Sequence, residues 1–173
     1  DLQAKQASAS EGHKAEFNGD GAVRIESSRY PFCASPADVS KDDNIRSAWS
    51  LVPFVEELNR LTLTVKNAGA GDYEVTWGQQ TQTVSGDKLS KGVNLMAIFE
   101  RTPFDNAFRQ VDEAVGRKQN YETKQIKSLF HGEEGGVDMN ATVELTEKAR
   151  APLAAAVRKA MKPVTHTISI RAK

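Results

Sequence analysis

A change of hydrophobic period at Thr102 constrains the fold of this chain more than any other feature. Before it, apolar residues alternate with polar ones over short stretches, at Val23 and Ile25, at Leu61, Leu63 and Val65, and at Tyr73, Val75 and Trp77. After it, apolar residues keep helical spacing at Phe104, Phe108, Val111 and Val115. Alternation indicates strands with one buried face, whereas recurrence every three or four residues indicates helices. The chain therefore predicts an α+β fold with strands first and helices second.

Residues 1–101 predict the β-rich part. Within it, residues 58–80 predict two strands joined by a glycine-rich turn, and a further hairpin turns at Gly78. The continuous apolar run "VNLMAIF" (93–99) has the length of a strand and predicts a central one. An antiparallel β-sandwich is the simplest arrangement for such strands. The prolines of residues 29–44 indicate a loop there.

Residues 102–162 predict a helical hairpin. Thr102 is expected to cap the first helix, with Pro103 at its first helical position. The glycine-rich segment 131–138 breaks that helix, and a second one is expected from about residue 140 to 161. Pro152 is expected to kink the second helix or to mark a restart.

Residues 163–173 return to the alternating pattern. Val164, His166, Ile168 and Ile170 fall on one face, so this segment predicts a terminal strand that packs back on the sheet. No linker divides the chain, and we expect its parts to form one compact unit.

Composition narrows the possible functions. Lys and Arg together number 23 and so do Asp and Glu, and the resulting net charge of zero argues against a nucleic-acid partner. No run of about 18 apolar residues occurs, so no membrane span is expected. Cys33 is alone and cannot form an intrachain disulfide, and we expect it to act as a small buried hydrophobe.

Two groups of residues could carry chemistry. His131, Glu133, Glu134 and Asp138 gather in the glycine-rich segment, but their spacing fits neither the zinc-protease helix nor a calcium loop. A solvated loop is the preferred interpretation. His166 lies on the apolar face of its strand, where a hydrogen-bonded core histidine is preferred over a catalytic one.

The aromatic residues Trp49, Tyr73 and Trp77 could stack on a sugar ring, although an alternating apolar face favours Trp77 as a core residue. The chain has no G-x-S-x-G elbow, no phosphate-binding loop and no dinucleotide fingerprint. We therefore assign no catalytic, cofactor-binding or metal-ligating residue, and no cofactor.

Several blocks in order resemble a known family. They are "SSRYPFC" (27–33), "ELNRLTLTVKN" (57–67), "VTWG" (75–78), "LSKGVNL" (89–95), "TPFDNAF" (102–108), "KQNYETKQIKSLF" (118–130) and "KPVTHTISI" (162–170). They are similar to the C-terminal half of bacterial, planctomycete-like SGNH hydrolases, also called GDSL-type esterases. The resemblance implies that a catalytic α/β/α module with a G-D-S serine block and a D-x-x-H block precedes such a region.

The chain lacks the catalytic blocks of that family. "GDKLS" (86–90) has lysine where the serine must stand, and no aspartate is followed by histidine three residues later. No catalytic residue of the family can be placed on this sequence, and a serine without its base and oxyanion donors is inert.

The resemblance implies an accessory region of a serine esterase that is silent alone and assists or packs on the catalytic module of the same protein. A carbohydrate ester is the substrate class it suggests, and export from the cell is implied as well. The first residue, Asp1, fits an isolated segment, a proteolytic product or a mature form. The alternative is a stand-alone module that binds a carbohydrate or a protein, and a stand-alone enzyme using His131 or His166 is a minor third possibility.

Overall fold

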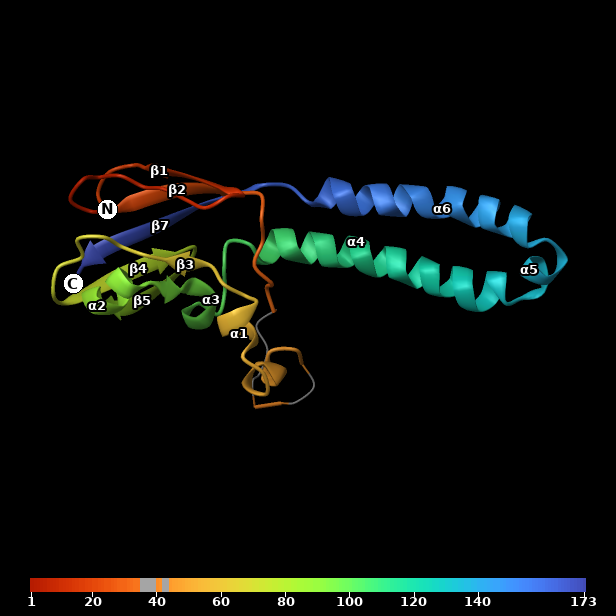
Figure 1. Ribbon diagram of the computed structural model, residues 1–173, viewed down its shortest axis with the longest axis horizontal. Coiled ribbons are helices and arrows are strands. Elements are labelled where there is room, and N and C mark those ends of the chain that lie inside the picture. The colour runs from red at the N-terminus through yellow and green to blue at the C-terminus, as the bar shows by residue number, and fades with distance from the viewer. Residues whose placement is uncertain (35–39, 42–43) are drawn as a thin grey trace. The chain divides into compact units, whose positions relative to one another are not determined.

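The computed structural model describes residues 1–34, 40–41 and 44–173 (Figure 1), so part of the expected loop at 29–44 lies outside the described residues. The fold is α+β with an antiparallel sheet, as predicted. The chain divides into two compact units, where we expected one: residues 1–105 with 163–173 form the first, and residues 106–162 form the second.

A five-stranded antiparallel sheet forms the centre of the first unit. Its strands are β1 (His13–Phe17), β2 (Ala22–Ser27), β7 (Val164–Ala172), β4 (Asp72–Trp77) and β5 (Gln80–Ser85), in that spatial order. The terminal strand β7 joins the sheet as predicted, and it lies between β2 and β4, so it connects the N-terminal hairpin to the β4–β5 hairpin. The turn of that second hairpin contains Gly78 with φ +63°, as the sequence indicated.

A smaller set of elements completes the first unit. It contains the two-residue strands β3 (Thr62–Leu63) and β6 (Val93–Asn94), the 3₁₀-helix Ser47–Ser50, and the short helices α1 (Phe54–Glu57), α2 (Gly86–Lys91) and α3 (Leu95–Ile98). β3 pairs with β6, in a two-stranded sheet of its own. Residues 58–80 therefore do not form the hairpin that the sequence predicted, because β4 pairs with β5 and β7 instead.

The predicted central strand at residues 93–99 is also wrong. Only Val93–Asn94 are extended, and the Asn94 side chain then accepts a hydrogen bond from the backbone N–H of Met96 at 3.2 Å. This cap starts the short helix α3. The buried side chains of α3 and of its C-cap are Leu95, Met96 and Phe99. The apolar run therefore contributes to the core without forming a strand.

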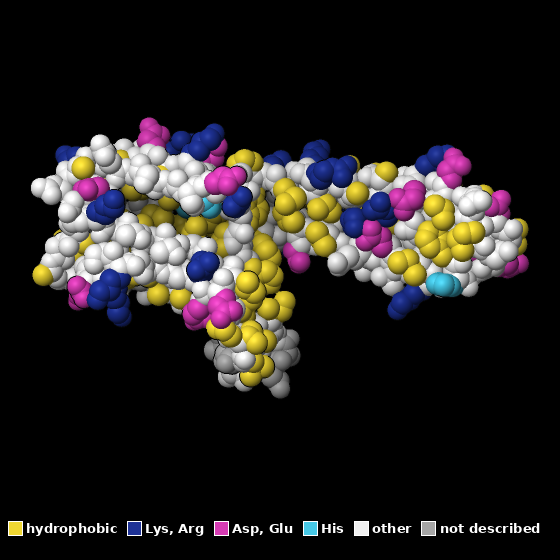
Figure 2. All heavy atoms as spheres, in the orientation of Figure 1, with side chains coloured by type: hydrophobic (Ala, Val, Ile, Leu, Met, Phe, Trp, Pro, Cys, Tyr) yellow, Lys and Arg dark blue, Asp and Glu magenta, His cyan; other side chains and the backbone are white. Residues whose placement is uncertain are grey.

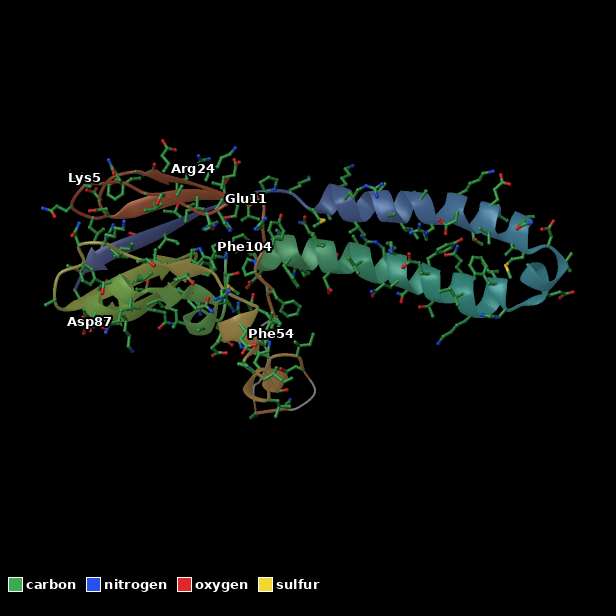
Figure 3. The ribbon with its side chains drawn as sticks, in the orientation of Figure 1. Lys5, Glu11, Arg24, Phe54, Asp87 and Phe104 are labelled. Atoms are coloured by element: carbon green, nitrogen blue, oxygen red, sulfur yellow. The ribbon has the colours of Figure 1, made fainter. Side chains whose placement is uncertain are left out.

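The core of the first unit is aromatic. Trp77 and Phe104 are fully buried, and their ring centroids lie 5.9 Å apart in an edge-to-face arrangement. Phe104, labelled in Figure 3, also contacts the ring of His166 at 4.9 Å between centroids. The face of the sheet that carries Trp77 and His166 is thus the buried one.

The second unit is a helical hairpin. It contains most of α4 (Asp105–Lys124), the π-helix Gln125–Phe130, α5 (Glu133–Val137) and α6 (Met139–Ala160). Pro152 lies inside α6 without ending it, so the predicted restart does not occur. Gln125 is buried between the helices and donates hydrogen bonds to Thr146 Oγ1 at 2.9 Å and to Glu147 Oε1 at 3.0 Å. None of the helices in the described part of the chain is long and apolar enough to cross a membrane.

Candidate functional site

A hollow of the first unit lies against one face of the five-stranded sheet. It has a volume of about 700 Å³, within the range of small-molecule sites. Strands β1, β2 and β7 line one side, and residues 60–66 together with the N-terminal segment line the other. Figure 2 shows hydrophobic atoms inside this hollow with histidine atoms among them.

The apolar lining follows from the alternation of the strands. Because successive side chains point to opposite faces, Ala15 and Phe17 of β1 share a face with Ile25 of β2 and with Ile168 of β7. All four line the cavity. The same alternation that buries the core therefore builds the cavity wall.

Three polar residues of the lining belong to a chain of hydrogen bonds that begins in the core and crosses four strands. Trp77 Nε1 donates to His166 Nδ1 at 3.0 Å, His166 Nε2 lies 3.0 Å from Ser27 Oγ, and Ser27 Oγ lies 2.8 Å from His13 Nδ1. His13 stands directly opposite Ser27 in the β1–β2 register. His166 and Ser27 are both buried, at 5% and 0% exposure.

The direction of these hydrogen bonds is set by Trp77. An indole N–H can only donate, so Nδ1 of His166 must accept, and the hydrogen of the neutral ring resides on Nε2. Nε2 then donates to Ser27 Oγ. The hydroxyl hydrogen of this buried serine needs an acceptor, and its other hydrogen bond offers Nδ1 of His13, so we assign the serine as donor there. His13 in turn carries its hydrogen on Nε2.

Electrostatics keep both histidines neutral near neutral pH. Burial, with a smaller contribution from the nearby His13, lowers the pKa of His166 from 6.5 to about 4. Burial also lowers the pKa of His13, with an additional contribution from the positive charge of Arg29. The polar chain is therefore a set of neutral donors and acceptors.

This geometry does not match that of a serine nucleophile activated by His166. A general base needs a free ring nitrogen facing the hydroxyl, whereas His166 presents an N–H to Ser27. The Ser27 side chain is also fully buried, so an ester carbonyl has no access to its oxygen. As preferred from the sequence, His166 is a hydrogen-bonded core histidine.

The residues of the predicted polar loop do not converge. His131 is exposed, and Asp138 accepts a hydrogen bond from the Ala141 backbone N–H at 3.0 Å as the N-cap of α6. Glu133 and Glu134 lie in α5, so residues 133–137 are helical and not the loop that the sequence suggested. Within the described ranges, no group of three or more His, Cys, Asp or Glu side chains is placed to hold a metal ion.

The aromatic candidates are mostly core residues. Trp77 and Tyr73 are buried, at 0% and 9% exposure, so neither offers a face to a sugar ring. Trp49 is half-buried, stacks on Phe54 at 5.9 Å and lies under the guanidinium of Arg46. Cys33 is buried, as expected, and burial raises the pKa of its thiol to about 12.

Sequence reasoning missed Ser27 and His13 as partners of His166. The sequence feature that could have pointed to them is their place, since His13 begins and Ser27 ends a short alternating segment. Their convergence depends on the pairing of three strands, and Ser27 and His166 alone are 139 residues apart in the sequence.

Comparison with known proteins identifies the fold. No family model and no curated protein matches this chain. The structure resembles that of a gut microbial diltiazem-metabolizing enzyme, with a TM-score of 0.65, 17% identity, and coverage of 99% of this chain and 48% of the other. The chain thus spans about half the length of that enzyme, and at this identity the likeness extends to the fold alone.

Proposed function

We propose that this chain is an accessory region of a larger SGNH-type ester hydrolase and has no esterase activity of its own. The SGNH assignment rests on one observation: the ordered sequence blocks of this chain resemble the C-terminal half of SGNH hydrolases. A place within a larger protein is consistent with the superposition of nearly the whole chain on about half of a longer one.

The geometry around Ser27 supports the proposal that this chain has no esterase activity of its own. The chain holds a serine beside two histidines, but the Ser27 side chain is fully buried, His166 donates to its oxygen, and no carboxylate orients either ring among the hydrogen bonds of the described residues. A hydrolase activity would therefore come from a serine outside these residues, on a catalytic module to which this region contributes packing or part of the substrate rim.

A serine-reactive probe tests the proposal directly. The purified chain, treated with a fluorophosphonate, is expected to remain unlabelled, and its hydrolysis of p-nitrophenyl acetate is expected to equal that of free imidazole. Labelling of the chain that disappears in Ser27→Ala would overturn the claim that the chain has no esterase activity. The reading frame on either side of this segment tests the rest, because a G-D-S block must occur in it.

A protein-binding module is the second candidate, and one observation favours it. Ile45, Leu51, Val52 and Leu58 are large apolar residues with exposures of 62%, 82%, 56% and 78%. Clustering of such side chains along one short segment is typical of an interaction site. A reading frame without any catalytic block would favour this candidate over the accessory region.

A further inference from the structure

The cavity against the sheet has a distinct polar end. A second hollow, of about 460 Å³, adjoins it, and Ser10, His13, Arg60 and Leu61 line both. His13 and Arg60 therefore lie at the same end of the main cavity. The apolar residues Phe17, Val23 and Ile170 line the remainder.

At this end of the cavity, two hydrogen-bond donors have no acceptor among the described residues of the protein. The hydrogen bonds that begin at Trp77 leave the hydrogen of His13 on Nε2, and that atom has no protein partner among the described residues. Arg60 makes no ion pair within the described part of the chain. A neutral N–H and a guanidinium thus both line this end of the cavity, beside its apolar wall.

The acidic groups of the region are already engaged. Glu11, which lines the adjoining hollow, lies 3.7 Å from the guanidinium of Arg29. Asp1 lines the main cavity, but its carboxylate accepts hydrogen bonds from Asn67 Nδ2 and from two backbone N–H groups. Lys66 also lines the cavity, so the charge left for a ligand to balance is positive.

We propose that this cavity binds an amphipathic monocarboxylate, with its apolar body against the β1, β2 and β7 face and its carboxylate at His13 and Arg60. The apolar walls match a hydrocarbon body and exclude a ligand that is polar throughout. A carboxylate accepts hydrogen bonds from both a guanidinium and an imidazole N–H, and such charged bonds are the stronger ones. The inference concerns the cavity alone and does not depend on the proposed accessory function.

Titration calorimetry of the 173-residue chain with decanoate, below its micelle concentration, tests the proposal. We expect saturable one-to-one binding, and binding of decanol weaker by about tenfold because the alcohol lacks the charge. Absence of saturable binding to the folded chain would overturn the site, and equal affinity for decanol would overturn the assignment of a carboxylate ligand.

Two pairs of variants locate the binding. Ala15→Phe fills the cavity and is expected to abolish binding, whereas Glu16→Phe changes the next residue of β1 on the exposed face and is expected to leave it unchanged. Arg60→Gln is expected to weaken decanoate binding about tenfold. Arg24→Gln, at an exposed arginine of β2 that does not line the cavity, is the matched control.

Circular dichroism shows whether each variant folds, and only folded variants are compared. If Ala15→Phe is not folded, Ala15→Leu replaces it as the filling variant. Decanoate binding that survives a filling variant, or that responds equally to Arg24→Gln and Arg60→Gln, would contradict the location.

Discussion

The indole N–H of Trp77 donates to Nδ1 of His166 across 3.0 Å in the buried core of the sheet. This contact fixes the tautomer of a histidine that otherwise has the position of a catalytic base beside a serine. Together with the hydrogen bond from His166 to Ser27, it links the side chains of three strands, β4, β7 and β2. The consequences can be measured in stability, in pH dependence and in variants of neighbouring positions.

Acidification is expected to destabilise the first unit through His166. Its folded pKa, about 4, lies below the ordinary value of 6.5, so the unfolded chain binds the proton more tightly. The contribution of His166 is therefore fully present above pH 6.5, falls as the pH drops from there to about 4, and is constant below. Its neighbour His13, also with a lowered pKa, adds a change of the same sign.

Urea unfolding at several pH values in this window, followed by tryptophan fluorescence, measures the effect. His166→Leu removes one titrating group, so the loss of stability on acidification is expected to be smaller in that variant than in the natural sequence. An identical pH dependence in both proteins would contradict the assigned pKa.

Ser27→Ala is expected to lower the free energy of unfolding by about 1–3 kcal/mol, because it leaves the buried Nε2–H of His166 without an acceptor. Ser28→Ala is the matched control. Its hydroxyl donates to the Gly12 carbonyl at the surface, and its loss is expected to cost less than about 1 kcal/mol. Urea titration of both variants gives the comparison, and equal losses would mean that the buried serine is not needed by its histidine partners.

Gly21→Ala is expected to be far more damaging than Gly19→Ala. Both glycines have positive φ, +73° and +86°, so an alanine at either site costs about 1 kcal/mol in backbone strain. At Gly21 the new Cβ would also overlap the Ile170 carbonyl oxygen on β7, whereas at Gly19 it meets open space. Thermal melting of the two variants should place Gly21→Ala well below Gly19→Ala, and similar melting temperatures would argue against this close approach of β2 and β7.

The helical unit offers an independent test. Gln125→Ala removes a buried amide with two hydrogen bonds to α6 and is expected to destabilise the hairpin by about 1–3 kcal/mol. Gln119→Ala, at an exposed position of α4, is expected to change its stability by less than about 0.5 kcal/mol. Far-UV circular dichroism during urea unfolding follows the helices, and a neutral Gln125→Ala would show that the amide is dispensable.

The elements that the sequence predicted best are those with a long, regular period. The second helix and the terminal strand were placed within a residue or two, because their apolar spacing is sustained over several repeats. The run at residues 93–99 could not be assigned in this way. A short apolar run suits a strand or a buried helix equally, and the local cap at Asn94 decides between them.

Strand pairing explains the other differences. Of the strand indicated by Leu61, Leu63 and Val65, only Thr62–Leu63 form one, and nothing local to the pattern favoured β6 over β4 as its partner. The candidate site depends on pairing in the same way. His13, Ser27 and His166 meet only because β1, β2 and β7 are neighbours in one register, and that information is distributed over the whole chain.

The position of β7 has a consequence for how this protein is made. Residues 164–172 are synthesised after every other strand of this sheet, yet they lie between β2 and β4 and join the two hairpins in the described structure. The β1–β2 and β4–β5 hairpins must therefore wait, with their apolar faces unpaired, while the entire helical hairpin is synthesised. Premature termination just before Val164 would yield two separate ribbons with exposed strand edges, the kind of nascent chain that chaperones bind.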